Sequence, residues 1–257
     1  MKIALFTNTY LPHVGGVARS VETLREQCVK QGHEVCVIAP RFSDDDEDLP
    51  HVLRVPAIQN FNGSDFCVKV PVPGLISDYL SEFEPDIIHS HHPFLLGDSA
   101  LRMGWMREIP VIFTHHTMYE QYTHYIANDS EILPKMAIEL ATEYSNLCDG
   151  VIAPSESVEK ILKERGVLPP IHSIPTGIDG EFFANGNGAK FRKEHGIPEN
   201  SFIIGHLGRL AYEKNIDFLS DSMGQVSRSN PDARFLIVGS GSEEELVKER
   251  FLEQGGN

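Results

Sequence analysis

Short apolar runs alternate with longer segments of helical periodicity through the first two thirds of the chain. The runs are rich in apolar and β-branched residues and predict strands at residues 2–7, 34–39, 52–56, 87–90, 111–114, 151–154 and 172–174. The segments between them predict helices at residues 17–31, 77–83, 100–107, 132–147 and 157–165. Because nearly continuous apolar strands suit a sheet buried on both faces, this order predicts an α/β fold with an open parallel sheet covered by helices.

The pattern breaks between Gly177 and Asn200, where the Gly/Asn-rich segment 184–188 precedes a short helical piece. Residues 178–200 are interpreted as a linker that follows an N-terminal domain of residues 1–177. Strands are then predicted at residues 202–207 and 235–238, and helices at residues 215–227 and from residue 242. Two strands and two helices are too few to close a doubly wound core. Residues 201–257 are therefore predicted to be the truncated start of a second domain.

The charge and the cysteines narrow the classes of function. The 257 residues include 22 Lys and Arg against 37 Asp and Glu, a formal net charge of −15. Because nucleic-acid binding depends on a cationic face, we expect no nucleic-acid partner. The four cysteines form no CxxC pair, which argues against a zinc ribbon or a thioredoxin-type motif. With no apolar run long enough for a signal peptide or a membrane span, we expect a cytoplasmic protein.

Gly15 and Gly16 lie in a loop that joins the first predicted strand to a helix. Glycine there lets the backbone approach an anion closely, while the free N–H groups of the helix N-terminus point toward that anion. Neither GxGxxG nor the P-loop pattern is present, which argues against a Rossmann dinucleotide site and a Walker ATPase. A tight strand-to-helix turn without a ligand would also favour glycine, so both interpretations stay open.

Five histidines lie at or just after the ends of two predicted parallel strands: His89, His91, His92, His115 and His116. Ligands of open α/β sheets bind at this edge. One interpretation is a metal site, because alternate residues of a strand point to one face, but no third ligand is obvious. The other gives one or two of the histidines a role in orienting an acceptor or handling a proton, as their ordinary near-neutral pKa allows.

Two further groups are candidates for binding. Tyr119 and Tyr122, with Ile126, recur at helical spacing directly after the histidines, and such a stripe fits either core packing or a platform for a sugar ring or a lipid glycerol. Arg209 and Lys214 follow a predicted strand and precede a helix. The two cations can converge on one polyanion, which makes them a candidate phosphate site, although a pair of exposed basic residues bonded to nearby carboxylates is the alternative.

The motifs in their order resemble those of retaining glycosyltransferases of family 4. The resemblance rests on Pro12 with Gly15-Gly16, and on the segments 2–6, 85–91, 113–117, 151–155, 174–179, 208–215 and 238–241. It covers essentially the whole chain. It implies a GT-B fold, in which a complete N-terminal Rossmann-like domain binds the acceptor and a second Rossmann-like domain binds a nucleotide sugar.

The resemblance also implies roles for individual residues. Gly15 and Gly16 would approach the donor phosphates, Arg209 and Lys214 would hold the leaving diphosphate, and His116 would be the active-site histidine beside the donor sugar. Cations at that position stabilise the charge that the leaving group acquires. Members of the family need no metal or other cofactor, and they transfer a hexose from a UDP- or GDP-sugar with retention of configuration.

The resemblance also implies an acceptor class and a second domain that is longer than the one in this chain. The segment from His116 to Ile126, with Tyr119, Tyr122 and His124, looks most like that of bacterial diacylglycerol glucosyltransferases, which implies a lipid acceptor and possible peripheral contact with the inner membrane face. Soluble sugar acceptors remain the alternative.

The family's second domain normally continues further and carries a Glu-x7-Glu motif, so the activity of this chain by itself is in doubt. A histidine-ligated metal hydrolase and a non-catalytic acceptor-binding half are the rival functions.

Overall fold

The computed structural model describes residues 1–42, 49–58, 68–70, 74–125 and 130–253. The chain forms two compact units, Met1–Ile178 and Asp179–Asn257, and each is described by itself. Among the described helices, none combines the length and the apolar character that a membrane-spanning segment needs.

The first unit is built on a seven-stranded sheet in the order β3-β2-β1-β6-β7-β8-β9, with every neighbouring pair parallel. All the strands predicted before residue 180 belong to this sheet. Their bounds are β1 Lys2–Phe6, β2 Glu34–Pro40, β3 Val52–Val55, β6 Ile87–Ser90, β7 Val111–Thr114, β8 Gly150–Ala153 and β9 Ile171–Ser173. A short antiparallel pair, β4 Ala57–Ile58 and β5 Val68–Lys69, was not predicted, because two-residue strands carry no periodicity.

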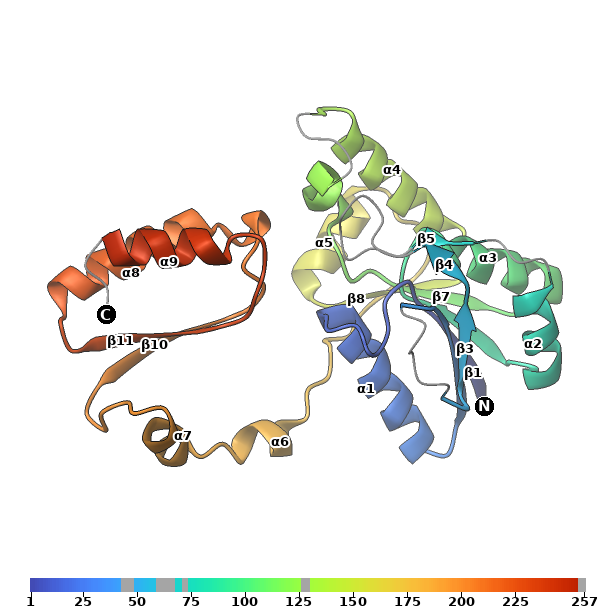
Figure 1. Ribbon diagram of the computed structural model, residues 1–257. Coiled ribbons are helices and arrows are strands. Elements are labelled where there is room, and N and C mark those ends of the chain that lie inside the picture. The colour runs from blue at the N-terminus through green and yellow to red at the C-terminus, as the bar shows by residue number, and fades with distance from the viewer. Residues whose placement is uncertain (43–48, 59–67, 71–73, 126–129, 254–257) are drawn as a thin grey trace. The chain divides into compact units, whose positions relative to one another are not determined.

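Helices cover both faces of this sheet, with α1 on one side and α2 and α3 on the other (Figure 1). Apolar residues of α1 pack on Leu5 and Val37, and the larger core on the other face surrounds Phe6, Ile88 and Phe113. The helices are α1 Gly16–Lys30, α2 Leu75–Phe83, α3 Leu96–Arg107, α4 Leu133–Asn146 and α5 Glu156–Glu164, together with the 3-10 segment η2 Tyr119–Tyr125. The strands are therefore buried on both sides, which explains their continuous apolar character.

The second unit is smaller and contains a parallel pair, β10 Phe202–Leu207 and β11 Ala233–Val238. Its helices are α6 Gly180–Ala184, α7 Gly188–Glu194, α8 Ile216–Ser229 and α9 Glu244–Glu253, with a 3-10 turn η3 Tyr212–Lys214. A small core surrounds Leu210, Ile216 and Val247. The segment expected to be a linker thus contains two short helices, each with a side-chain N-cap, from Asp179 and from Asn187.

Many large apolar side chains of the second unit are exposed. Phe202, Leu207 and Phe218 have exposed fractions of 62%, 80% and 68%. Burial of apolar area is the main stabilising contribution to a fold, so this unit draws less stability from its core than the first unit does.

Candidate active site

The predicted histidines meet at one edge of the first sheet. β6 and β7 run in parallel with Ser90 opposite Phe113, so the residues after each strand emerge at the same edge. His89 lies within β6, whereas His91 and His92 follow it directly, and His115 and His116 follow β7. The structure therefore brings together all five histidines that the sequence placed at strand ends.

Ring contacts and hydrogen bonds join three of these histidines and fix their orientations. The His91 ring stacks on His89, with centroids 4.2 Å apart, and on His116, with centroids 5.2 Å apart. His91 Nδ1 and His116 Nε2 are 2.9 Å apart and share a hydrogen bond. His89 Nε2 bonds Thr114 Oγ1 at 2.7 Å. A ladder of imidazoles therefore runs from β6 to the residue proposed for catalysis.

The glycine loop begins beside this ladder. His91 N donates to Phe6 O at the end of β1, and Asn8 N donates to His92 Nδ1 at 3.1 Å. The same loop continues to Gly15, which is the N-cap of α1, and no acidic side chain occupies the first turn of that helix. The free N–H groups of the helix N-terminus therefore have no neighbouring carboxylate in that turn. A Cβ at Gly15 would lie 3.1 Å from His13 Nε2, whereas one at Gly16 would meet nothing within 4 Å.

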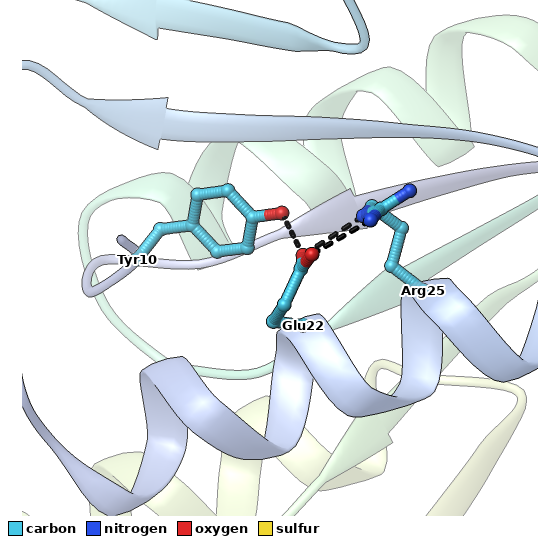
Figure 2. A network of polar contacts seen from close by, with 3 residues as sticks. All are labelled: Tyr10, Glu22 and Arg25. Carbon is cyan, nitrogen blue, oxygen red and sulfur yellow. Dashed lines mark hydrogen bonds and ion pairs between the residues drawn. The ribbon is translucent and has the colours of Figure 1, made fainter. Parts of the chain in front are cut away.

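A polar network that the sequence did not reveal ties this loop to α1 (Figure 2). The hydroxyl of Tyr10, which is fully buried, donates to Glu22 on α1, and Glu22 also accepts from Arg25 at 2.6 and 2.8 Å. Burial would raise the pKa of Glu22, but the hydrogen bonds from Arg25 and Tyr10 outweigh it and lower that pKa. Buried Arg54 donates to the carbonyl of Leu11 from β3. Tyr10 and Leu11 thus tie this part of the loop to α1 and to β3.

Burial keeps the five histidines neutral. It lowers the pKa of His89 and of His92 to about 3, and that of His115 and of His116 to about 4, and the smaller cause is the interaction with a neighbouring histidine or, for His115, with the Arg165 cation. The pKa of His91 is also well below its ordinary value for the same reasons. The near-neutral pKa expected from the sequence is therefore wrong for these side chains. At pH 7 they offer neutral imidazoles, each with one N–H donor and one acceptor nitrogen.

The histidine geometry bears on the metal interpretation. Within the described residues, no three or more His, Cys, Asp or Glu side chains are grouped so as to hold a metal ion. The His89 and His91 rings stack at an interplanar angle of 29°, and His91 and His116 direct a nitrogen at each other in a hydrogen bond, whereas metal ligands direct their nitrogens at one ion. The arrangement suits hydrogen bonding better than metal ligation.

The acceptor candidates lie in η2, which contacts α4. The Tyr119 ring makes edge-to-face contacts with Phe94 and His115, so it is part of the packing around the histidine edge. Tyr122 is half-buried. The side chain of His124 and residue Ile126 lie outside the described part of the chain. Glu120, which the sequence analysis did not single out, accepts from Arg165 at the end of α5 at 2.6 Å and anchors η2.

The donor candidates Arg209 and Lys214 belong to the second unit, and both side chains are exposed. Arg209 lies between β10 and η3, and Lys214 ends η3. The adjoining loop after β11 lies against this segment, because Gly208 N donates to Val238 O, and a Cβ at Gly239 would come within 1.8 Å of Gly208 O. Only glycine permits that approach.

A hollow of about 400 Å³ lies beside Lys214 and is lined by Tyr212, Asn215, Ile216, Asp217 and Glu243. Its two carboxylates would repel a phosphate, so this hollow is a poor site for a diphosphate. The Arg209 and Lys214 side chains themselves remain the candidate cationic contacts.

The chain belongs to Glycosyltransferase Family 4, whose model matches residues 14–182. The model of Glycosyl transferases group 1 matches residues 188–257. The family predicted from the ordered motifs is thereby confirmed.

Curated relatives are similar along nearly the whole chain. An alpha-monoglucosyldiacylglycerol synthase of Streptococcus pneumoniae is 33% identical over 94% of this chain and 56% of its own length. A protein of the same name from Acholeplasma laidlawii is 29% identical over 96% of this chain and 65% of its own length. A GDP-mannose-dependent alpha-mannosyltransferase of Corynebacterium glutamicum is 29% identical over 97% of this chain and 60% of its own length. The chain thus spans roughly three fifths of these relatives.

Solved structures show the same fold. Sucrose-phosphate synthase from Thermosynechococcus elongatus has a TM-score of 0.74 at 20% identity, over 99% of this chain and 68% of its own. Anabaena HepE, solved with UDP and glucose, has a TM-score of 0.71 at 17% identity, over 99% of this chain and 66% of its own. These neighbours are glycosyltransferases of the GT-B type, so the predicted α/β fold class is confirmed.

Proposed function

We propose that the whole protein transfers a hexose from a UDP- or GDP-sugar to a diacylglycerol-like lipid, with retention of configuration and without a metal ion. The observation that carries this proposal is the similarity of 94% of the chain to an alpha-monoglucosyldiacylglycerol synthase, within a family match that covers the histidine edge. A soluble sugar acceptor is the second candidate, because other similar proteins are named as mannosyltransferases.

In this proposal the two units divide the chemistry. The Gly15-Gly16 loop approaches the donor phosphates, since the N-terminus of α1 directs N–H groups outward. Arg209 and Lys214 neutralise the diphosphate as the glycosidic bond breaks, because positioned cations stabilise charge that develops on a leaving group. His116 lies beside the donor sugar as a neutral hydrogen-bonding group, and η2, with Tyr119, Tyr122 and His124, borders the acceptor.

The surface next to η2 supports a lipid acceptor. Ile132, Met136, Leu140 and Leu147 form a stripe along α4 and its two ends, with exposed fractions of 67%, 47%, 53% and 71%, and the exposed Glu143 interrupts it. Their spacing places them within one side of the helix. An exposed apolar stripe on a helix that packs against η2 suits peripheral contact with the membrane that holds the acceptor. This protein would then act at the cytoplasmic face of that membrane.

A donor and acceptor screen of the whole protein tests the proposal. Radiolabelled UDP-glucose and GDP-mannose are each offered with vesicles that contain diacylglycerol, or with a set of soluble sugars, and each reaction is run with and without an excess of chelator. We expect label in the lipid fraction with one of the two donors and an α-linked product. Label in a soluble product would favour the second acceptor class. Activity that disappears with chelator and returns only with zinc or manganese would favour the metal-hydrolase alternative.

A further inference from the structure

His91 is the middle ring of the imidazole ladder and is 1% exposed. It stacks on His89 with one face, contacts the His116 ring, and shares its Nδ1 hydrogen bond with His116 Nε2 at 2.9 Å. Its other nitrogen, Nε2, is buried and has no hydrogen-bond partner among the described residues. These contacts determine which of the two rings, His91 or His116, carries the proton of their shared hydrogen bond.

Two neutral arrangements of the pair are possible. If His116 donates, then His91 Nδ1 accepts and His91 must carry its proton on Nε2, which leaves a buried N–H donor without an acceptor. If His91 donates from Nδ1, its Nε2 is a bare acceptor and no donor is left unpaired. Buried N–H groups without a partner are rarer in proteins than acceptors that lack one. The second arrangement is therefore favoured.

The same buried position also disfavours a positively charged His91. An imidazolium would donate from both nitrogens and leave its Nε2–H unpaired in a desolvated position. The groups that face His91 are themselves histidines, His89 and His116, and neither is an anion that could stabilise the charge. Burial and these neighbours lower the pKa of His91 well below its ordinary value.

We propose that His91 is a positioning residue, which donates its Nδ1 proton to His116 Nε2 and so holds His116 as the Nδ1–H tautomer. With Nε2 occupied, the ring nitrogen of His116 that remains for substrate is Nδ1, and it carries the proton. His116 then acts on the sugar as a hydrogen-bond donor and not as a base. The functional part of this inference rests on the proposed function, because that proposal makes His116 the active-site histidine.

Long-range ¹H–¹⁵N correlation spectra of the ¹⁵N-histidine-labelled chain test the inference directly, because the two tautomers give different cross-peak patterns. The His116 signals are assigned by their loss in His116→Gln. At pH 7.5 we expect His116 to carry its proton on Nδ1 and His91 also on Nδ1. A His116 ring with its proton on Nε2, or an imidazolium, would overturn the inference.

A variant at His91 tests whether this residue sets the tautomer. His91→Leu removes the donor at the Nδ1 position, so His116 should shift toward the Nε2–H form that free imidazole side chains prefer. His92→Leu is the matched control, since the His92 ring bonds the Asn8 backbone and should leave His116 as Nδ1–H. An unchanged His116 tautomer in a folded His91 variant would contradict the inference.

The wild-type spectrum decides the tautomer even where a variant fails to fold. Because the readout needs no substrate, it also separates the two proposals. A protein that transfers no hexose but holds His116 as Nδ1–H would defeat the proposed function alone. Transfer of hexose by a protein whose His116 carries its proton on Nε2 would defeat the inference about His91 alone.

Discussion

The histidines at the ends of β6 and β7 make the stability of the first unit depend on pH. The pKa of His89 falls from about 6.5 in an unfolded chain to about 3 in the folded one. The unfolded chain therefore binds more protons below pH 6.5, and stability is lost as pH falls from about 6.5 toward 3. For one fully buried histidine that stays neutral, the loss at pH 5 is about 2 kcal/mol.

Urea denaturation at pH 7.5 and pH 5 measures this effect. We expect a clearly lower midpoint at pH 5, and a smaller pH dependence in His89→Gln. The matched control is His172→Gln, which removes an exposed histidine of β9 and should keep the full pH dependence. Equal midpoints at the two pH values in the wild type would contradict the neutral, buried state of the ladder.

The two cations of the second unit should matter for rate and not for folding. Arg209→Ala or Lys214→Ala in the whole protein should lower turnover by about 10²- to 10³-fold, because each would remove one of the charged contacts proposed for the leaving diphosphate. Both side chains are exposed, so thermal stability should change little. Lys193→Ala, at an exposed lysine of α7, is the control for charge alone. Wild-type kinetics in both variants would exclude these residues from the donor site.

At the scale of elements, the packing of α3 on the β6–α3 loop leaves no room for a side chain at Gly97. A Cβ there would lie 2.0 Å from the carbonyl oxygen of His92 and 3.1 Å from Tyr144 Oη. Gly97→Ala should therefore destabilise the protein by about 1–3 kcal/mol, the usual cost of overpacking. Gly188→Ala, also in the first turn of a helix but with nothing within 4 Å, should not destabilise it. Equal urea midpoints for the two variants would contradict this packing.

The stripe on α4 gives a second prediction at this scale. Leu140→Glu should weaken binding of the whole protein to zwitterionic vesicles on the order of tenfold, because a leucine loses its apolar burial. Glu139→Gln changes the neighbouring exposed residue and should not weaken it. Vesicle cosedimentation measures both. Equal binding by Leu140→Glu and the wild type would remove α4 from the membrane contact.

The sequence predicts the strands of the main sheet well, because a parallel sheet buried on both faces requires continuous apolar runs such as 111–114. It places the start of α3 too late, at residue 100 where the structure has Leu96. Leu95 has φ 57°, a conformation that no local pattern announces. The helix α6 was missed because it is shorter than the window in which helical periodicity can be recognised, whereas α7 is the short helical piece predicted after the Gly/Asn-rich segment 184–188.

The site was only partly predictable for a related reason. Strand ends can be read along the chain, so His91 and His116 could be placed at one edge. The Tyr10–Glu22–Arg25 network and the Glu120–Arg165 pair join residues from different elements, and only the packed structure brings them together. Burial, which lowers the pKa of the histidines, is likewise a property of the fold and not of a motif.

At the scale of the whole molecule, the first unit should fold without the second. It holds the large apolar clusters and the complete seven-stranded sheet, whereas the second unit has a small core. A fragment of residues 1–178 should unfold cooperatively in urea and protect the amides of β1 and β6 from hydrogen exchange as the full chain does. Loss of that protection in the fragment would show that the first unit depends on the second.

The central claim is that the whole protein is a nucleotide-sugar glycosyltransferase whose chemistry takes place at the histidine edge. The most direct test measures hexose transfer from UDP-glucose and from GDP-mannose to diacylglycerol vesicles or soluble sugars, by the wild type and by His116→Ala. Hydrogen exchange checks that the variant is folded. We expect the wild type to transfer hexose from one of these donors and the variant to be slower by about 10²-fold or more. A wild type that uses neither donor, or a folded variant as fast as the wild type, would contradict the account.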